Sequence, residues 1–261
     1  MYKKLRDLPA PQGLYDPAYE HDACGIGFVV NITGKKSYDI LDQALTILEN
    51  LKHRGAEGAD AKSGDGAGIL VQIPHQFFCR ECEVLGFSLP AAGDYGVGMI
   101  FAHRYETFRK QQMAEFEAIV RSEGLSVLGW RDVPVDESLI GSIAKTTRPH
   151  FLQVFIRRSD ALKTQMDFER KLYIIRKRSS IAIANLHLKH CKEFYICSCS
   201  ARTVVYKGQL LATQVGIYYR DLQDARCISA LAMIHQRFST NTFQQWQLAH
   251  PFRYIAHNGE I

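Results

Sequence analysis

The sequence lacks several features that mark particular classes of protein. No uninterrupted apolar run approaches the roughly 20 residues that a helix needs to cross a bilayer. The first residues are charged and contain no apolar core of a secretory signal. The net charge of +5 is spread over short basic runs rather than gathered into blocks, which disfavours nucleic-acid binding. We therefore expect a soluble, cytoplasmic protein that has neither a membrane nor a nucleic acid as its partner.

The cysteines lack the spacing of a disulfide framework. There are 7 of them, an odd number in a chain of 261 residues, and this favours free thiols in a reducing compartment. Cys197 and Cys199 alternate inside a strand-like run, so we expect both thiols to share one face of a strand. Their C-x-C spacing is a weak signal for a metal, and packing in the core is the favoured interpretation. No metal site is predicted.

Internal repeats, low-complexity segments and an obvious linker are also missing. The composition, with 46% hydrophobic and 23% charged residues, is ordinary for a globular protein, and the length suits one large domain or two small ones. Helical periodicity covers residues 37–55, 74–87, 106–124 and 166–178. Strand-like runs cover residues 24–31, 68–74, 94–103, 126–134, 150–158, 193–201, 203–208, 227–239 and 252–261.

Many of these strands adjoin one another without an intervening helix. This order predicts an α+β fold with stacked, antiparallel-rich sheets and helices outside, rather than a doubly wound parallel sheet. The runs at residues 193–201 and 203–208 are a candidate hairpin.

The stretch HDACGIGF places Cys24 directly before a strand-like run. A free cysteine is most often a small buried hydrophobe. If residues 1–23 are removed, however, Cys24 carries a free α-amino group beside its thiol. That amine titrates near pH ~8 and can take the thiol proton, so one residue would supply both base and nucleophile. Both interpretations stay open on these residues alone.

The stretch IHQRFSTNT places Arg237 beside several hydroxyl side chains, Thr240 among them. A polar strand end is the simpler interpretation. A planar guanidinium also matches the two oxygens of a carboxylate, and hydroxyl groups can satisfy the remaining lone pairs. This segment is therefore a candidate carboxylate site.

The stretch YIAHNGEI holds Asn-Gly between apolar arms, which predicts a hairpin because a type I′ turn needs positive φ at both central residues. Such a tip can also point the Asn258 amide and the Gly259 N–H at one spot, as an oxyanion hole. Upstream, SGDGAG lacks the lysine of a phosphate-binding loop, so we expect a glycine-rich turn that passes close to another backbone. Arg54, in LKHRGAEGAD, is expected to orient a site or to serve the structure.

Taken together, these segments resemble the glutaminase domain of glutamate synthase large subunits, a class II glutamine amidotransferase. The resemblance covers nearly the whole chain in the expected order, and its last two stretches are the most specific. The matching stretches are HDACGIGF at 21–28, LKHRGAEGAD at 51–60, SGDGAGI at 63–69, SARTVVYKG at 200–208, IHQRFSTNTFQQW at 234–246 and HPFRYIAHNGEI at 250–261.

The resemblance implies a four-layer αββα sandwich of the N-terminal-nucleophile hydrolase type, incomplete at the C-terminus. It implies a leader over residues 1–23 and a partial amidotransferase domain over residues 24–261. It also assigns roles to the candidate residues, namely the nucleophile Cys24, the oxyanion pair Asn258 and Gly259, the carboxylate ligands Arg237 and Thr240, and the supporting residue Arg54.

The reaction implied is hydrolysis of L-glutamine to glutamate and ammonia through a cysteine thioester, with the ammonia passed to 2-oxoglutarate. No cofactor is expected in this chain, whereas FMN and an iron–sulfur cluster are implied for a synthase portion outside it. That synthase domain and a small reductase subunit are the implied partners. The acidic residue with which the family holds the substrate ammonium lies beyond the Asn-Gly turn, so we expect the chain to be a piece of a longer protein.

Two alternatives stay open at this point. The chain is either an N-terminal-cysteine amidase that acts on a different amide, or an unprocessed, truncated fragment without activity. Arg237 favours glutamine over a lipid-like acyl amide, because glutamine offers a carboxylate partner.

Overall fold

The computed structural model describes residues 10–13, 16, 25–186, 194–236, 244–253 and 255–256. The strands formed there are β1 (Ile26–Val30), β2 (Ala67–Gln72), β3 (Tyr95–Ala102), β4 (Ser126–Asp132), β5 (His150–Arg157), β6 (Tyr195–Ser200), β7 (Thr203–Gly208) and β8 (Leu231–Gln236). The helices are α1 (Tyr38–Asn50), α2 (His75–Val84), α3 (Glu106–Ser122), α4 (Ser142–Thr147), α5 (Gln165–Ala184) and α6 (Ala212–Tyr218). Short 3-10 turns are η2 (Lys52–Arg54), η3 (Glu137–Leu139), η5 (Arg220–Gln223) and η6 (Trp246–Leu248).

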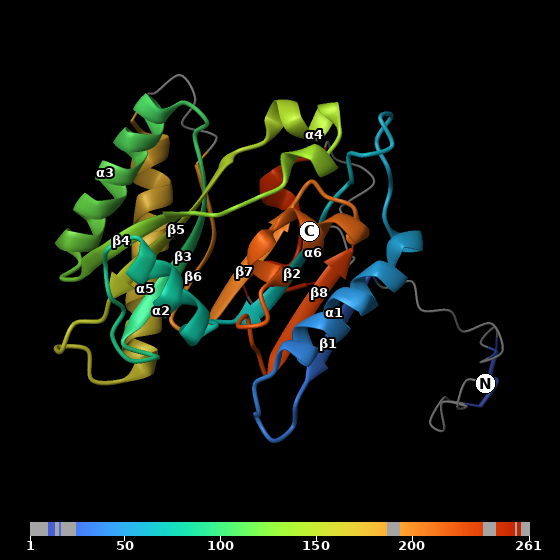
Figure 1. The fold of residues 1–261 in the computed structure, drawn as a ribbon, viewed down its shortest axis with the longest axis horizontal. Coiled ribbons are helices and arrows are strands. Elements are labelled where there is room, and N and C mark those ends of the chain that lie inside the picture. The colour runs from blue at the N-terminus through green and yellow to red at the C-terminus, as the bar shows by residue number, and fades with distance from the viewer. Residues whose placement is uncertain are drawn as a thin grey trace.

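The strands form two antiparallel sheets, which we name the first sheet, in the order β1-β8-β2-β7, and the second sheet, in the order β4-β5-β3-β6. Helices α1 and α6 pack on the first sheet, and α3 and α5 pack on the second. Strand β7 of the first sheet contacts β3 and β6 of the second (Figure 1). The described residues therefore form the αββα layers that the family resemblance implies.

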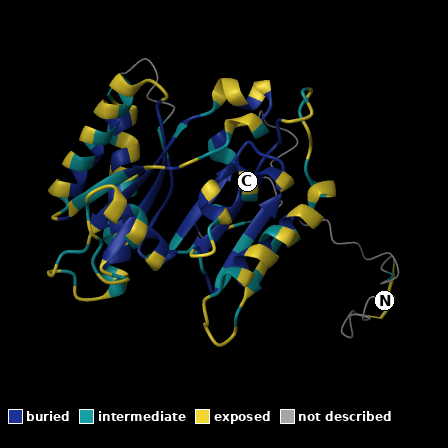
Figure 2. Cartoon of the chain, viewed as in Figure 1, coloured by how far each residue is buried: buried dark blue, intermediate teal, exposed yellow. Residues whose placement is uncertain are grey.

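Amphipathic spacing determines which side of each helix is buried. The predicted stripe of α1 is confirmed at Leu41, Ala44 and Leu48, which are fully buried. On the other side of the molecule, Phe116 of α3 and Phe168 of α5 belong to a core cluster with the second sheet. Figure 2 shows the strands largely buried and the outward faces of these helices exposed. The helices predicted from periodicity are thus present and face the expected way.

Burial of the first sheet falls off steadily from one edge to the other. Leu70 of β2 lies opposite both Val205 of β7 and Met233 of β8, and Met233 lies opposite Phe28 of β1. Paired residues share a sheet face, yet exposure is 0% at Val205, 4% at Leu70 and 69% at Phe28. The packed centre between the sheets therefore lies over β7 and β2, and β1 is its open edge.

One expectation about local structure was wrong. Strands β6 and β7 do not form a hairpin, because β6 pairs with β3 and β7 pairs with β2, so the chain crosses between sheets at residues 201–202. The described part of the expected strand at residues 252–261 has no strand pairing. Helices α4 and α6 were not predicted, since each is too short to show a helical repeat.

The two cysteines of the CSCS stretch also differ from expectation. Cys197 belongs to the core cluster between the layers, whereas Cys199 belongs to the cluster under α3 and α5. The pairing of β3 with β6 shifts between Met99 and Ile100, and such a bulge interrupts the alternation of faces. Both thiols are fully buried, and desolvation raises each pKa to about 12, as expected for cysteines packed in the core.

A buried ion pair joins the second sheet to the turn that follows α6. Arg131 of β4 donates to both carboxylate oxygens of Asp221, each at 2.8 Å, and also to Gln153 at 2.9 Å. The Tyr206 hydroxyl of β7 donates to the same carboxylate at 2.9 Å. The side chains of Arg131 and Asp221 are 5% and 1% exposed. This network therefore links both sheets through charged groups that water hardly reaches.

We predict that Asp221→Ala lowers the free energy of unfolding by about 3–5 kcal/mol, because it leaves a buried guanidinium without its main partner. The matched control is Glu137→Ala, which removes the 54% exposed partner of Arg148 and should cost about 1 kcal/mol at most. Urea unfolding followed by tryptophan fluorescence measures both. Equal losses in the two variants would contradict the role given to the Arg131 network.

Candidate functional site

The start of β1 and the end of β8 meet at one corner of the first sheet. The strands are antiparallel, with Ile26 opposite His235. Next to that pair, the backbone N–H of Gln236 donates a 2.7 Å hydrogen bond to the carbonyl oxygen of Gly25. Gly25, His235 and Gln236 are all buried. In sequence, Gly25 follows the predicted nucleophile and Gln236 precedes the predicted carboxylate ligand, so this corner joins the two segments that carry them.

The turn containing Arg54 reaches the same corner. A Cβ atom placed on Gly55 would lie 1.7 Å from the side-chain nitrogen of Gln236, so the turn lies directly against Gln236 and depends on a glycine there. Arg54, at the end of η2, is partly buried. Of the predicted site residues, Arg54 lies in the described part of the chain, and the adjacent Gly55 places it next to this corner.

The loop after this turn is held by Asp60. Its carboxylate accepts backbone N–H groups from Ile143 at 3.0 Å and from Ser63 at 2.8 Å, as well as the Ser63 hydroxyl at 2.8 Å. Hydrogen bonds to the ionised carboxylate hold the pKa of Asp60 well below its usual range. The bond from Ile143 has the largest effect, and those from Ser63 have smaller ones. The ionised Asp60 therefore fastens the loop to the start of α4.

The glycine-rich turn is packed against other backbone, as predicted. A Cβ on Gly64 would lie 2.1 Å from the carbonyl group of Leu210, and one on Gly68 would lie 2.5 Å from the carbonyl oxygen of His250. Gly68 in turn lies opposite His235 on β8. These glycines permit close approach of chain segments around the corner, and the turn does not open a helix that would bind phosphate.

A segment that we name the connector, residues 244–253, crosses the same region. It links the predicted carboxylate-binding stretch to the predicted oxyanion turn. The Trp246 indole N–H donates to the Ala144 carbonyl at 3.2 Å, and the Lys207 ammonium donates to the Gln247 carbonyl at 2.9 Å. Arg253 forms a buried ion pair with Glu169 of α5. The connector is therefore fixed at several points along its length.

Three residues next to the corner were not assigned a role from the sequence. The rings of His235 and His250 lie 4.6 Å apart, so the connector stacks on the end of β8. Lys207 is fully buried on β7, and burial lowers its pKa to about 7. The available sequence signal for Lys207 was a lysine inside the otherwise apolar run TVVYKG.

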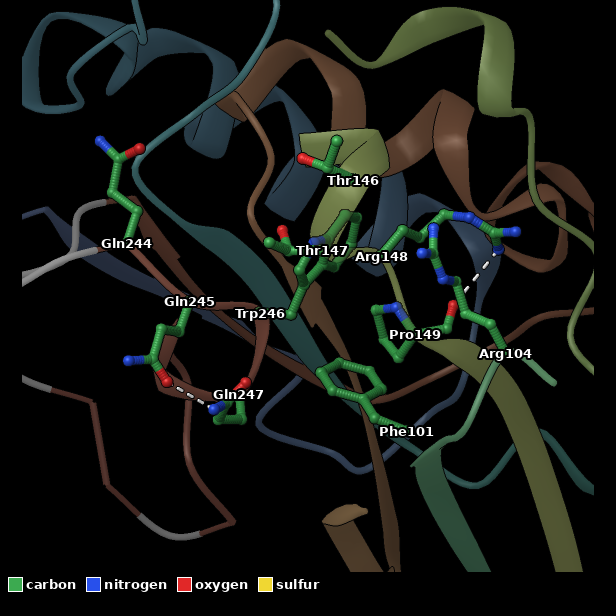
Figure 3. A pocket seen from close by; sticks show the side chains of 10 residues that line it. All are labelled: Phe101, Arg104, Thr146, Thr147, Arg148, Pro149, Gln244, Gln245, Trp246 and Gln247. Carbon is green, nitrogen blue, oxygen red and sulfur yellow. Dashed lines mark hydrogen bonds between the residues drawn. The ribbon is translucent and has the colours of Figure 1, made fainter. Parts of the chain in front are cut away.

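A pocket of about 310 Å³ lies beside the connector. Residues Gln244–Gln247 of the connector line one side of it, and the end of α4 with Arg148 lines another. Figure 3 shows the guanidinium groups of Arg104 and Arg148 on the side away from Gln244. Arg148 also pairs with Glu137 at 2.7 Å. Arg54, His235 and Gln236 are not among the described residues that line this pocket.

The other predicted site residues lie outside the described part of the chain, namely Cys24, Arg237, Thr240, Asn258 and Gly259. Among the described residues, no group of three His, Cys, Asp or Glu side chains is arranged to hold a metal ion. In that same part of the chain, no helix is both long enough and apolar enough to cross a membrane.

Comparison with known proteins gives a consistent result. The profile of the family "Glutamine amidotransferases class-II" matches residues 24–261. The chain is 48% identical to the glutamate synthase [NADPH] large chain of Bacillus subtilis, over 97% of this chain and 16% of the relative. It is 43% identical to glutamate synthase [NADH] of Schizosaccharomyces pombe, over 97% of this chain and 12% of the relative. It is 42% identical to ferredoxin-dependent glutamate synthase 2, chloroplastic, of Arabidopsis thaliana, over 96% of this chain and 15% of the relative.

The chain thus spans at most 16% of the length of each of these three relatives. The family profile nevertheless matches it from Cys24 to Ile261, well over half of the chain. The protein belongs to the class II glutamine amidotransferases.

Proposed function

We propose that this chain is the glutaminase domain of a glutamate synthase, and that it hydrolyses L-glutamine to glutamate and ammonia with Cys24 as nucleophile. The observation that carries the proposal is the corner where the Gln236 N–H bonds the Gly25 carbonyl. It joins the chain just after the proposed nucleophile to the chain just before the proposed substrate ligands. The family match also begins at Cys24.

The proposed chemistry needs the leader over residues 1–23 to be removed. The free α-amino group of Cys24 then takes the thiol proton, and the thiolate attacks the side-chain amide carbon of glutamine. The Asn258 amide and the Gly259 N–H stabilise the oxyanion, each such donor contributing on the order of 3 kcal/mol. The ammonium of Cys24 returns its proton to the departing ammonia, and water hydrolyses the thioester.

The proposed substrate contacts follow the same chain segments. Arg237 and Thr240 bind the α-carboxylate of glutamine by a charge-assisted pair and a hydroxyl. Arg54 acts from behind, since its turn is packed on Gln236. This set explains why a polar stretch follows directly after the buried end of β8.

In the longer protein, ammonia passes to a synthase domain that converts 2-oxoglutarate to a second glutamate. FMN and an iron–sulfur cluster would supply the electrons for that step in the synthase portion. A small reductase subunit is a further proposed partner. The names of the relatives include NADPH, NADH and ferredoxin as electron donors, so the likeness does not select one donor.

We predict that Cys24→Ala in the full-length protein abolishes ammonia release from glutamine, because the alanine supplies no thiolate. Cys79→Ala, which removes a partly buried free thiol of α2, is the control and should keep the normal rate. A diazo-ketone analogue of glutamine should label Cys24 alone, and N-terminal sequencing should begin at that residue. Undiminished release by Cys24→Ala would refute the proposed function.

We predict that Arg237→Gln raises the KM for glutamine by roughly 30-fold or more, because truncating one member of a charge-assisted pair costs about 2–5 kcal/mol. An amide that lacks the α-carboxylate should be hydrolysed slowly and equally by both forms. Steady-state assays with the two substrates give the comparison. A preference for N-acyl amino acids over glutamine in the normal protein would instead favour the alternative amidase.

We predict that Gly55→Ala destabilises the protein by about 1–3 kcal/mol and slows glutamine hydrolysis, because the new methyl group overlaps Gln236. Adding Gln236→Ala makes room for that methyl group. The double variant should therefore lose less stability than the two single losses combined. Urea unfolding and glutaminase assays measure the cycle, and strictly additive losses would disprove the contact.

A further inference from the structure

Lys207 lies between strand β6 and the connector and is completely buried. Its ammonium donates to the Gln247 carbonyl at 2.9 Å and to the Tyr195 hydroxyl at 3.2 Å. Lys207 is 0% exposed. The side chain therefore ties the connector to β6 and β7 without contact with water.

Two aromatic rings also contact the side-chain nitrogen of Lys207. The Lys207 nitrogen lies 4.2 Å from the centre of the Phe252 ring and 4.9 Å from that of Tyr195. When Lys207 is protonated, the negative faces of these rings attract its ammonium and offset part of the hydration lost on burial. Gln247 and Phe252 both belong to the connector, so one lysine holds it near its middle and near its end.

This lysine has no acidic partner in the described part of the chain. The titratable or charged groups around it in the described part of the chain include Tyr195 and Cys197 of β6, Arg176 of α5, His250 of the connector and Tyr219 after α6, whose pKa burial also raises. Desolvation lowers the pKa of Lys207 to about 7, although Cys197 opposes the shift. Burial raises the pKa of Cys197 to about 12 and also raises that of Tyr195, so neither of those two groups changes charge near neutral pH.

Protonation of Lys207 must therefore be linked to docking of the connector. When the connector leaves, the amine meets water and its pKa returns toward the ordinary 10.5. Between about pH 7 and 10 the released state then binds more protons than the docked state. Docking consequently strengthens as pH rises through this range, and below about pH 7 it no longer depends on this group.

We propose that Lys207 is a positioning residue that docks the connector, and that uptake of a proton by its side chain favours release of the connector. If the proposed function holds, the connector joins the segment that binds the glutamine carboxylate to the turn that forms the oxyanion hole. Its release separates the two halves of the glutamine site. Lys207 thus makes the geometry of that site depend on pH.

Hydrogen exchange of the connector amides in the full-length protein tests this directly. From about pH 7.5 to 9.5, above the usual histidine range, protection corrected for the intrinsic exchange rate should rise by up to about tenfold per pH unit. Lys207→Met has no ionisable group and should show no such rise. Lys110→Met, which removes an exposed lysine paired with Glu106, is the matched control and should keep the normal rise.

An equal rise in Lys207→Met, or no rise in the normal protein, would overturn the proposal. If Lys207→Met does not fold, Lys207→Arg serves instead, because its guanidinium stays charged throughout this range and its protection must also be flat. The ratio of kcat/KM for glutamine between the normal and Lys207→Met proteins should increase over the same pH range. The exchange measurement does not depend on turnover, so it stands or falls separately from the Cys24→Ala result.

Discussion

The hydrogen bond from the Gln236 N–H to the Gly25 carbonyl is the contact on which the proposed site depends. It continues the antiparallel pairing of β1 with β8, and side chains alternate between faces with a period of two. A slip of one residue would exchange the buried and exposed faces of β1. Strand β8 is also paired with β2 on its other edge, so its end is fixed from both sides. The sheet thereby holds two segments that are distant in sequence at one corner.

Close packing of loops on that corner requires small residues at defined places. Gly55 meets Gln236, Gly64 meets the Leu210 backbone and Gly68 meets the His250 carbonyl. None of these contacts leaves room for a Cβ atom without movement of a neighbour. At these three positions glycine serves close approach rather than an unusual φ angle. The loops are therefore parts of the site's framework.

The sequence predicted those parts of the fold that depend on local periodicity. The stripe of Leu41, Ala44 and Leu48 predicts α1 because the period of 3.6 is visible within one helix. The crossing between sheets after Ser200 and the bulge beside Cys197 depend on pairing with β3, and no local pattern encodes a partner so far away. The motifs indicated the residue types of the site. The contacts of Lys207 with the connector could not be predicted, because they join residues that only the fold brings together.

Two buried cations show how different surroundings give different roles. Arg131 is bound by Asp221 and by the partly exposed Glu81, so acidic partners match its positive charge. Lys207 has a carbonyl, a hydroxyl and two rings, and these neutral partners do not replace the water lost by an ammonium. Arg131 therefore braces the two sheets. How strongly Lys207 holds the connector depends on pH, because the burial that places its nitrogen at Gln247 also disfavours its protonated form.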